Sequence, residues 1–264
     1  METEEIKKNS GGKVALIAAV SVIAAFLIYY MVMVMLSPGR KLDELKAEYK
    51  PAGKEGVSEK IPGDSTYLSL LREKAWAQSK VAMAQNDSIY MTINLSDSTS
   101  NLEISGVSVF STKISSYEMS TILRKCDQSV ILNMLSTPLT IESAFATLKK
   151  EPVMIKVAPK DTSEYEPDIM PDTSLIDPVN YILEMKNGFR IYVYQEETNT
   201  APERKAQFRF DLTDRISTAV RCLKSVMSFK VPEYHPYIKI KIPRDDGKII
   251  YRAIPRNGQI AIYT

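Results

Sequence analysis

The 264-residue chain is poor in the side chains that most often carry enzyme chemistry. It has two cysteines, one histidine and one tryptophan. Two distant cysteines and a single histidine make no zinc pattern, and two cysteines are too few for a disulfide framework. The sequence also lacks a P-loop and a dinucleotide-binding fingerprint. These absences exclude the common nucleotide and zinc sites, and we expect no cofactor.

An excess of charge of one sign is missing as well. The chain has 34 basic and 32 acidic residues and a formal net charge of +2. A nucleic-acid-binding protein normally carries a strongly basic face, so this balance argues against nucleic acid as a partner. The apolar fraction of 44% is ordinary for a folded domain, which argues against global disorder.

The few reactive residues leave two readings open. Cys126 and Cys222 either form one bridge or stay as two thiols, and the usual burial of free cysteine favours thiols. His235 is followed by proline and has no cysteine at a useful offset, which favours a packing role. Catalysis by either cysteine with His235 would need the fold to bring them together.

A long run without charge dominates the N-terminal part. Residues 14–36 contain no charged side chain, and 23 residues of helix span roughly 35 Å, enough to cross a bilayer. The run is too long for a signal-peptide core, and a buried core helix of this length would normally show a polar face. We therefore predict a transmembrane helix. Small residues four apart, Ala15 and Ala19 with Ser21 and Ala25, are compatible with a homo-dimer.

The predicted helix divides the chain into four parts. Residues 1–13 form a short cytoplasmic tail, and residues 37–63 form a polar stalk or linker in which residues 41–49 can continue as helix. The Ser-Pro-Gly sequence at residues 37–39 is expected to end the anchor. Residues 64–264 form the folded domain, with a helix over residues 64–86 and a core over residues 89–264. Basic residues nearly balance on the two flanks of residues 14–36, so charge alone does not orient the helix.

Within the domain, apolar spacing and turn residues predict the elements. Trp76 is expected to pack the helix of residues 64–86 onto the core. Strands are predicted at residues 89–95, 101–104 and 107–114, with an extended segment at 138–141 and a hairpin of residues 181–185 and 189–194 around Asn187-Gly188. Helices are predicted within residues 117–135 and at residues 211–227. Residues 158–178 are rich in proline and acid, and a solvated loop is favoured there over a calcium site, because calcium-loop spacing is missing.

The stretch of residues 235–263 carries the most informative pattern. Ile238, Ile240 and Ile242 alternate with Lys239 and Lys241, which predicts a strand with an apolar side and a basic side. Pro243 ends this strand, and the next two acids, residues 245 and 246, offer oxygens for a helix start. Isoleucines at helical spacing, Pro255, an Asn-Gly turn and the apolar residues 260–262 then predict a short helix and a final strand.

This strand–helix–strand unit resembles the C-terminal end of the L,D-transpeptidase family, the cysteine enzymes that crosslink peptidoglycan. The matching run is Ile240-Lys241-Ile242-Pro243, then Asp245-Asp246, Tyr251, Pro255, Gly258 and residues 260–262. The strands at residues 89–109 are similar to the opening hairpin of that family. At the family's Ser-His-Gly-Cys motif, however, this chain has Pro236, Tyr237, Ile238 and Lys239, so the nucleophile and its neighbouring base are replaced.

The resemblance implies an α+β, mostly β fold: an L,D-transpeptidase-like β-sandwich with flanking helices, preceded by one N-terminal transmembrane helix. It implies a bacterial protein of the cytoplasmic (inner) membrane whose domain is extracytoplasmic or periplasmic. Such a pseudoenzyme would bind peptidoglycan or an envelope protein in cell-wall organisation. The residues expected around its vestigial cleft are Tyr237, Lys239, Lys241 and Gln195.

Two other functions stay open. The chain is alternatively a structural subunit of an envelope secretion or division complex, in which the fold is only a scaffold. The third candidate is an active enzyme of unrecognised mechanism, for which His235 and Cys222 are the residues to replace.

Overall fold

The computed structural model describes the backbone of residues 5–49, 65–150, 178–198 and 200–264. The predicted acidic loop and much of the predicted stalk lie outside these residues. The chain divides into two compact units. The first comprises Met1–Glu48 with Thr213–Tyr234, and the second comprises Tyr49–Leu212 with His235–Thr264.

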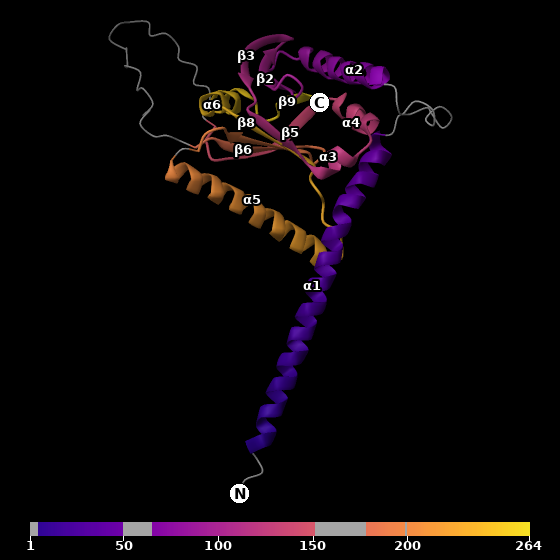
Figure 1. Cartoon of the computed structure of the whole chain (residues 1–264), viewed down its shortest axis with the longest axis vertical. Coiled ribbons are helices and arrows are strands. Elements are labelled where there is room, and N and C mark those ends of the chain that lie inside the picture. The colour runs from indigo at the N-terminus through magenta and orange to yellow at the C-terminus, as the bar shows by residue number, and fades with distance from the viewer. Residues whose placement is uncertain (1–4, 50–64, 151–177, 199) are drawn as a thin grey trace, which may run out of the picture. The chain divides into compact units, whose positions relative to one another are not determined.

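The described residues form six helices and nine strands (Figure 1). In chain order these are α1 (Glu5–Tyr49), α2 (Ser65–Ala84), β1 (Tyr90–Asn94), β2 (Thr99–Ile104), β3 (Val107–Lys113), β4 (Ser116–Met119), α3 (Thr121–Lys125), α4 (Gln128–Leu135), β5 (Leu139–Ala146), β6 (Asn180–Met185), β7 (Arg190–Gln195), α5 (Ala201–Met227), β8 (Tyr237–Ile242), α6 (Arg244–Ala253) and β9 (Gln259–Tyr263).

The α+β class is confirmed, but the expectation that strands dominate is wrong. More of the described residues lie in helices than in strands. Two helices are also longer than their apolar patterns predicted. The helix predicted over residues 211–227 begins at Ala201, and its added first part carries four charged residues and a proline in ten positions, so periodicity did not mark it.

The other long helix is α1. It continues through Pro38 to Tyr49, so the prediction that residues 37–39 end it is wrong. Proline removes one N–H donor from the helix ladder, but the residues that follow, LDELKAE, are strong helix formers. Residues 13–49 make a helix that is long and apolar enough to cross a membrane, by length and composition.

The second unit is built on one mixed sheet with the strand order β3-β2-β1-β9-β5-β6-β7-β8-β4. β1 runs parallel to β9 and β7 parallel to β8, and the other neighbours are antiparallel. β5 pairs with β9 through Leu139 and Thr140 and with β6 from Ile141 onward, with a register shift after Ile141. Such a bulge bends the strand, so β5 joins two halves of the sheet.

Helix α2 packs on the first half of the sheet, as predicted from Trp76. The indole meets the ring of Tyr263 edge-on, with centroids 5.6 Å apart. It also packs against a buried cluster of Met83, Tyr90 and Ala261. One aromatic side chain therefore joins α2 to the strands that open and close the domain.

The strands β7 and β8 present two chemically different faces. Parallel register sets Ile191, Val193 and Gln195 beside Ile238, Ile240 and Ile242, and this set defines the isoleucine face. The opposite side carries Arg190, Tyr192 and Tyr194 beside Tyr237, Lys239 and Lys241, and this set defines the lysine face. The three isoleucines are buried and Lys241 is exposed. The predicted alternation of β8 is confirmed.

Part of the lysine face is covered by the N-terminal half of α5. Phe210 stacks on Phe145 of β5 at a centroid distance of 5.1 Å and meets Tyr194 edge-on at 6.3 Å. The hydroxyl of Tyr194 donates to Asp211 at 2.9 Å. This end of α5 is therefore fixed to the sheet by aromatic packing and a hydrogen bond.

Candidate functional site

Lys239 lies where the predicted cleft was centred, and its side chain has two neighbours on the lysine face. Its Nζ is 3.6 Å from Oε2 of Glu118 and 4.9 Å from the ring centroid of Tyr237. Glu118 is the cross-strand partner of Lys239 in the β4–β8 pair. We call Glu118, Tyr192, Tyr237 and Lys239 the Lys239 cluster.

The aromatic members give this cluster its shape. The rings of Tyr192 and Tyr237 meet edge-on with centroids 5.7 Å apart, and the Tyr237 hydroxyl is 3.5 Å from Oε1 of Glu118. Partial burial, followed by the negative charge of Glu118, raises the pKa of Tyr237. Tyr237 is therefore a neutral phenol at physiological pH, and Lys239 is the cation of the cluster.

Lys239 is accessible to a ligand. Its side chain is 36% exposed and that of Glu118 is 59% exposed. Ion pairs this exposed contribute only about 0–1 kcal/mol, so an external carboxylate can compete with Glu118 for the ammonium group. Lys241 is exposed on the same face, two residues along β8. The arrangement suits an anionic group held by the ammonium group of Lys239.

Gln195 does not belong to this cluster, and its predicted place in the cleft is wrong. It lies on the isoleucine face and is 2% exposed. Its Oε1 accepts from the backbone N–H of Val179 at 2.8 Å, and its Nε2 donates to the carbonyl of Glu197 at 2.7 Å. Because side chains alternate along a strand, Gln195 shares a face with Ile242 and not with Lys241. Its amide instead fixes both chain segments that border β6 and β7.

His235 has a packing role, as its sequence context favoured. Its Nδ1 is 2.9 Å from the carbonyl oxygen of Gly188, and a carbonyl only accepts, so Nδ1 carries the proton. The same atom is 3.8 Å from Glu184, which forms an ion pair of 2.9 Å with Arg190. These contacts hold the segment before β8 against the β6–β7 turn.

Both cysteines are free thiols, as favoured from the sequence. Cys126 is buried and Cys222 is half-buried. Cys126 follows α3 on the isoleucine side of the sheet, where it lines a cavity. Cys222 lies on α5. Neither side chain belongs to the Lys239 cluster.

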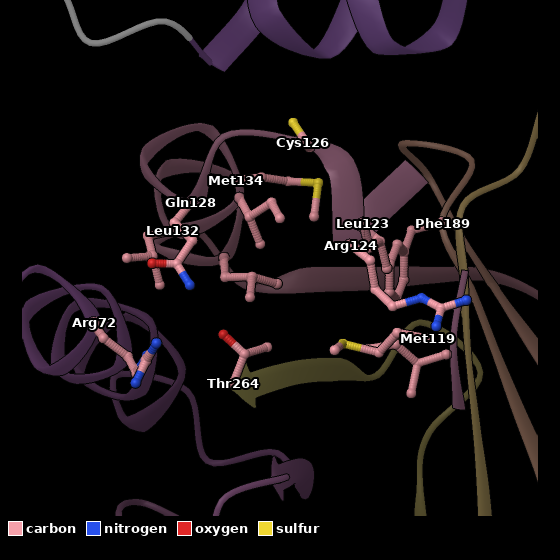
Figure 2. Close-up of a pocket in the computed structure, with 13 residues that line it drawn as sticks. Arg72, Met119, Leu123, Arg124, Cys126, Gln128, Leu132, Met134, Phe189 and Thr264 are labelled. Carbon is pink, nitrogen blue, oxygen red and sulfur yellow. The ribbon is translucent and has the colours of Figure 1, made fainter. Parts of the chain in front are cut away.

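The cavity lies on the opposite side of β8 from Lys239 and has a volume of about 290 Å³. Figure 2 shows apolar side chains in its middle and the guanidinium groups of Arg72 and Arg124 on two sides. Its apolar lining comes from β4, α3, α4, β8 and the turn before β7, namely Met119, Leu123, Cys126, Ile131, Leu132, Met134, Leu135, Phe189 and Ile238. This volume is at the low end for small-molecule sites.

Sequence reasoning missed both this cavity and Glu118. The cavity lining is spread over residues 72–264, and no local pattern marks such a set. The position of Glu118 beside Lys239 was missed because a helix was predicted within residues 117–135, whereas β4 occupies Ser116–Met119. An alternation of serine, tyrosine, glutamate and methionine is a weak strand signal that only pairing with β8 makes clear.

Among the described residues, no three His, Cys, Asp or Glu side chains gather where they could hold a metal ion. Comparison of the chain with protein-family models, curated proteins and solved structures finds no match.

Proposed function

We propose that this chain is a membrane-anchored, non-catalytic relative of the L,D-transpeptidases that binds peptidoglycan through the Lys239 cluster. Residues 14–36 anchor it in the inner membrane of a bacterium, and the second unit faces the periplasm. The two halves of the sheet that meet at the β5 bulge correspond to the two layers of the family's sandwich.

The element order at the C-terminal end supports this relationship. β8, α6 and β9 follow one another as strand, helix and strand at the positions that carry the family-like residues. Asp245 and Asp246 lie in the first turn of α6, and the residue at its N-cap is Pro243. Acidic side chains in a first turn complement the positive end of the helix dipole, so these residues favour the helix start by charge.

The observation that carries the proposal is the Lys239 cluster. At the position of the family's nucleophile the chain has a half-exposed ammonium group, beside one tyrosine ring and in a weak ion pair. Peptidoglycan offers carboxylates on its peptide stems and sugar faces that pack on aromatic rings. A lysine beside Tyr192 and Tyr237 matches that combination of groups.

The experiment is sedimentation of the detergent-solubilised full-length protein with insoluble purified peptidoglycan. Lys239→Glu is expected to weaken binding about tenfold or more, because a charge-assisted hydrogen bond contributes about 1.5–3 kcal/mol. Glu118→Gln is expected to strengthen binding, because it removes the internal carboxylate that competes for Lys239.

Lys113→Glu is the matched control, since it makes the same charge change at an exposed lysine on β3. It should bind like the wild type. Equal binding by the Lys239, Glu118 and Lys113 variants would rule out the cluster as the site. Failure of the wild-type protein to sediment with peptidoglycan would rule out the proposed function.

A structural subunit of an envelope secretion or division complex is the second candidate. The observation that favours it is β3, an edge strand of the sheet on which Val107 and Val109 are both more than half exposed. An open strand edge accepts a strand from a partner protein. Co-purification of stoichiometric membrane partners, without binding to isolated peptidoglycan, would support this function over the first.

A further inference from the structure

Helix α5 carries an apolar stripe on its exposed side. The stripe residues recur every three or four positions and are each at least 40% exposed; they are Phe208, Leu212, Ile216, Val220, Leu223 and Met227. Positions three or four apart lie on one face of a helix, and the first and last are about 29 Å apart at 1.5 Å per residue. Phe210, which packs on the sheet, points the other way.

The charges of α5 are sorted by sign. All six basic residues of the helix are exposed, namely Arg204, Lys205, Arg209, Arg215, Arg221 and Lys224. Its three acidic residues, Glu203, Asp211 and Asp214, are buried or half-buried. The outward side of α5 is therefore apolar and positive, a combination typical of helices that lie in the surface of an anionic bilayer.

The first unit places the end of α5 next to the predicted membrane span. Phe229, two residues beyond α5, packs against Tyr29 of α1 with ring centroids 6.1 Å apart. Tyr29 belongs to the uncharged run of residues 14–36. This contact places the C-terminal end of α5 beside the part of the chain that is predicted to cross the membrane.

The backbone at Phe229 supports a function for its exposed ring. The amide of Lys230 bonds to the Ser225 carbonyl at 2.9 Å and the amide of Phe229 to the Val226 carbonyl at 3.0 Å, which is the Schellman arrangement. Phe229 has φ +54°, a left-handed conformation in which glycine is usual and other residues are strained. The chain therefore keeps an 82% exposed phenylalanine at a position that favours glycine.

We propose that α5 lies in the surface of an anionic phospholipid bilayer, with its stripe and Phe229 among the acyl chains and its basic side chains on the lipid phosphates. The helix is a second, surface-bound membrane contact that adds to α1. The inference is independent of peptidoglycan binding.

The test uses the full-length protein in vesicles of phosphatidylcholine with phosphatidylglycerol, in which a fraction of the phosphatidylcholine has brominated acyl chains. Trp76→Phe removes the one tryptophan, and Val220→Trp then places a probe on the stripe. Val109→Trp is the matched control, because Val109 is 56% exposed and Val220 is 58% exposed. Ile216→Trp is a second probe of the stripe in case one variant fails to fold.

The expected result is a blue-shifted emission from the Val220→Trp probe that brominated lipid quenches, with an unquenched emission from the Val109→Trp control. The double substitution of Arg215→Gln with Lys224→Gln, or high salt, should reduce the quenching, because both weaken attraction to lipid phosphates. A stripe emission that is quenched by aqueous iodide but not by brominated lipid would overturn the proposal. So would a blue-shifted emission that neither quencher reaches, which would identify a protein on the stripe, such as a second copy of this chain.

Discussion

Lys80 on α2 reaches the buried carboxylate of Glu103 on β2, with Nζ 3.0 Å from Oε1. The same carboxylate accepts from the hydroxyl of Tyr90 at 3.2 Å and from that of Thr92 at 3.0 Å. Glu103 is 3% exposed. A buried charge is tolerated when it is paired and fully hydrogen-bonded, and this network attaches α2 to the first half of the sheet.

Lys80→Met is therefore expected to lower the free energy of unfolding by about 1–3 kcal/mol. The loss is smaller than the 3–5 kcal/mol of a fully buried pair, because Lys80 is one-third exposed. Urea unfolding of the full-length protein in detergent measures it. Lys74→Met, at an exposed lysine of the same helix, is the control and should change stability little. Equal effects of the two variants would contradict a special role for the Lys80–Glu103 pair.

The buried hydroxyl of Tyr181 is expected to lower the free energy of unfolding at high pH. It is fully buried, its hydroxyl has no hydrogen-bond partner among the residues that the structure describes, and its ring lies 4.9 Å from that of Tyr251. Burial, and then the neighbouring Tyr251, raise the pKa of Tyr181. The folded state therefore keeps the phenol proton when the unfolded state loses it.

The stability that this proton contributes is complete below about pH 10, the pKa of tyrosine in an unfolded chain. It is lost as the pH rises further, by up to about 1.4 kcal/mol per pH unit for one group. Tyr181→Phe should flatten this alkaline slope and leave stability at pH 7 unchanged or higher, since it removes an unsatisfied buried hydroxyl. Urea unfolding between pH 7 and pH 11 tests both effects, and an unchanged slope would contradict the assignment.

Gly258 is required by close packing at the turn before β9. A Cβ at this position would lie 2.6 Å from a methyl group of Ile254 and 3.0 Å from the carbonyl oxygen of Pro255. Ile254 is buried, so the methyl group has little room to move. Gly258→Ala is expected to destabilise the domain by about 1–3 kcal/mol. Gly39→Ala is the control, because a Cβ there meets no atom of the described part of the chain within 4 Å. A stable Gly258→Ala variant would show that the turn adjusts.

The sequence predicted most of the sheet because its strands are marked by local signals. The alternation of β8 and the Asn187-Gly188 turn between β6 and β7 both appear where predicted. The strand order was not predictable, because β1 pairs with β9, and β7 with β8, across long stretches of chain. Periodicity fixes which side of one strand is apolar, but only register fixes which strands share that side.

The dependence on strand pairing also explains why three of the four predicted cleft residues share a face and the fourth does not. Tyr237, Lys239 and Lys241 share a face because they alternate within one strand, and that could be read from β8 alone. Gln195 was assigned to the cleft only from the family resemblance, and it lies on another strand. The face on which the Gln195 side chain lies depends on the parallel pairing of Gln195 with Ile242. This pairing places its amide on the isoleucine face, where it bonds to backbone groups. The function of the cluster stays a prediction that the binding experiment tests.

The Phe229→Gly variant distinguishes the effect of residue 229 on stability from its effect on membrane binding. Glycine relieves the left-handed strain at this position, and the expected result is a gain of about 1 kcal/mol in the free energy of unfolding in detergent. Phe229→Leu keeps the strain and an apolar side chain, so it should show no such gain. In brominated vesicles Phe229→Gly should lower the quenching of the Val220→Trp probe, while Phe229→Leu should largely preserve it. A Phe229→Gly protein that is less stable than the wild type would mean that the ring contact with Tyr29 outweighs the backbone strain, and that Phe229 is retained for packing.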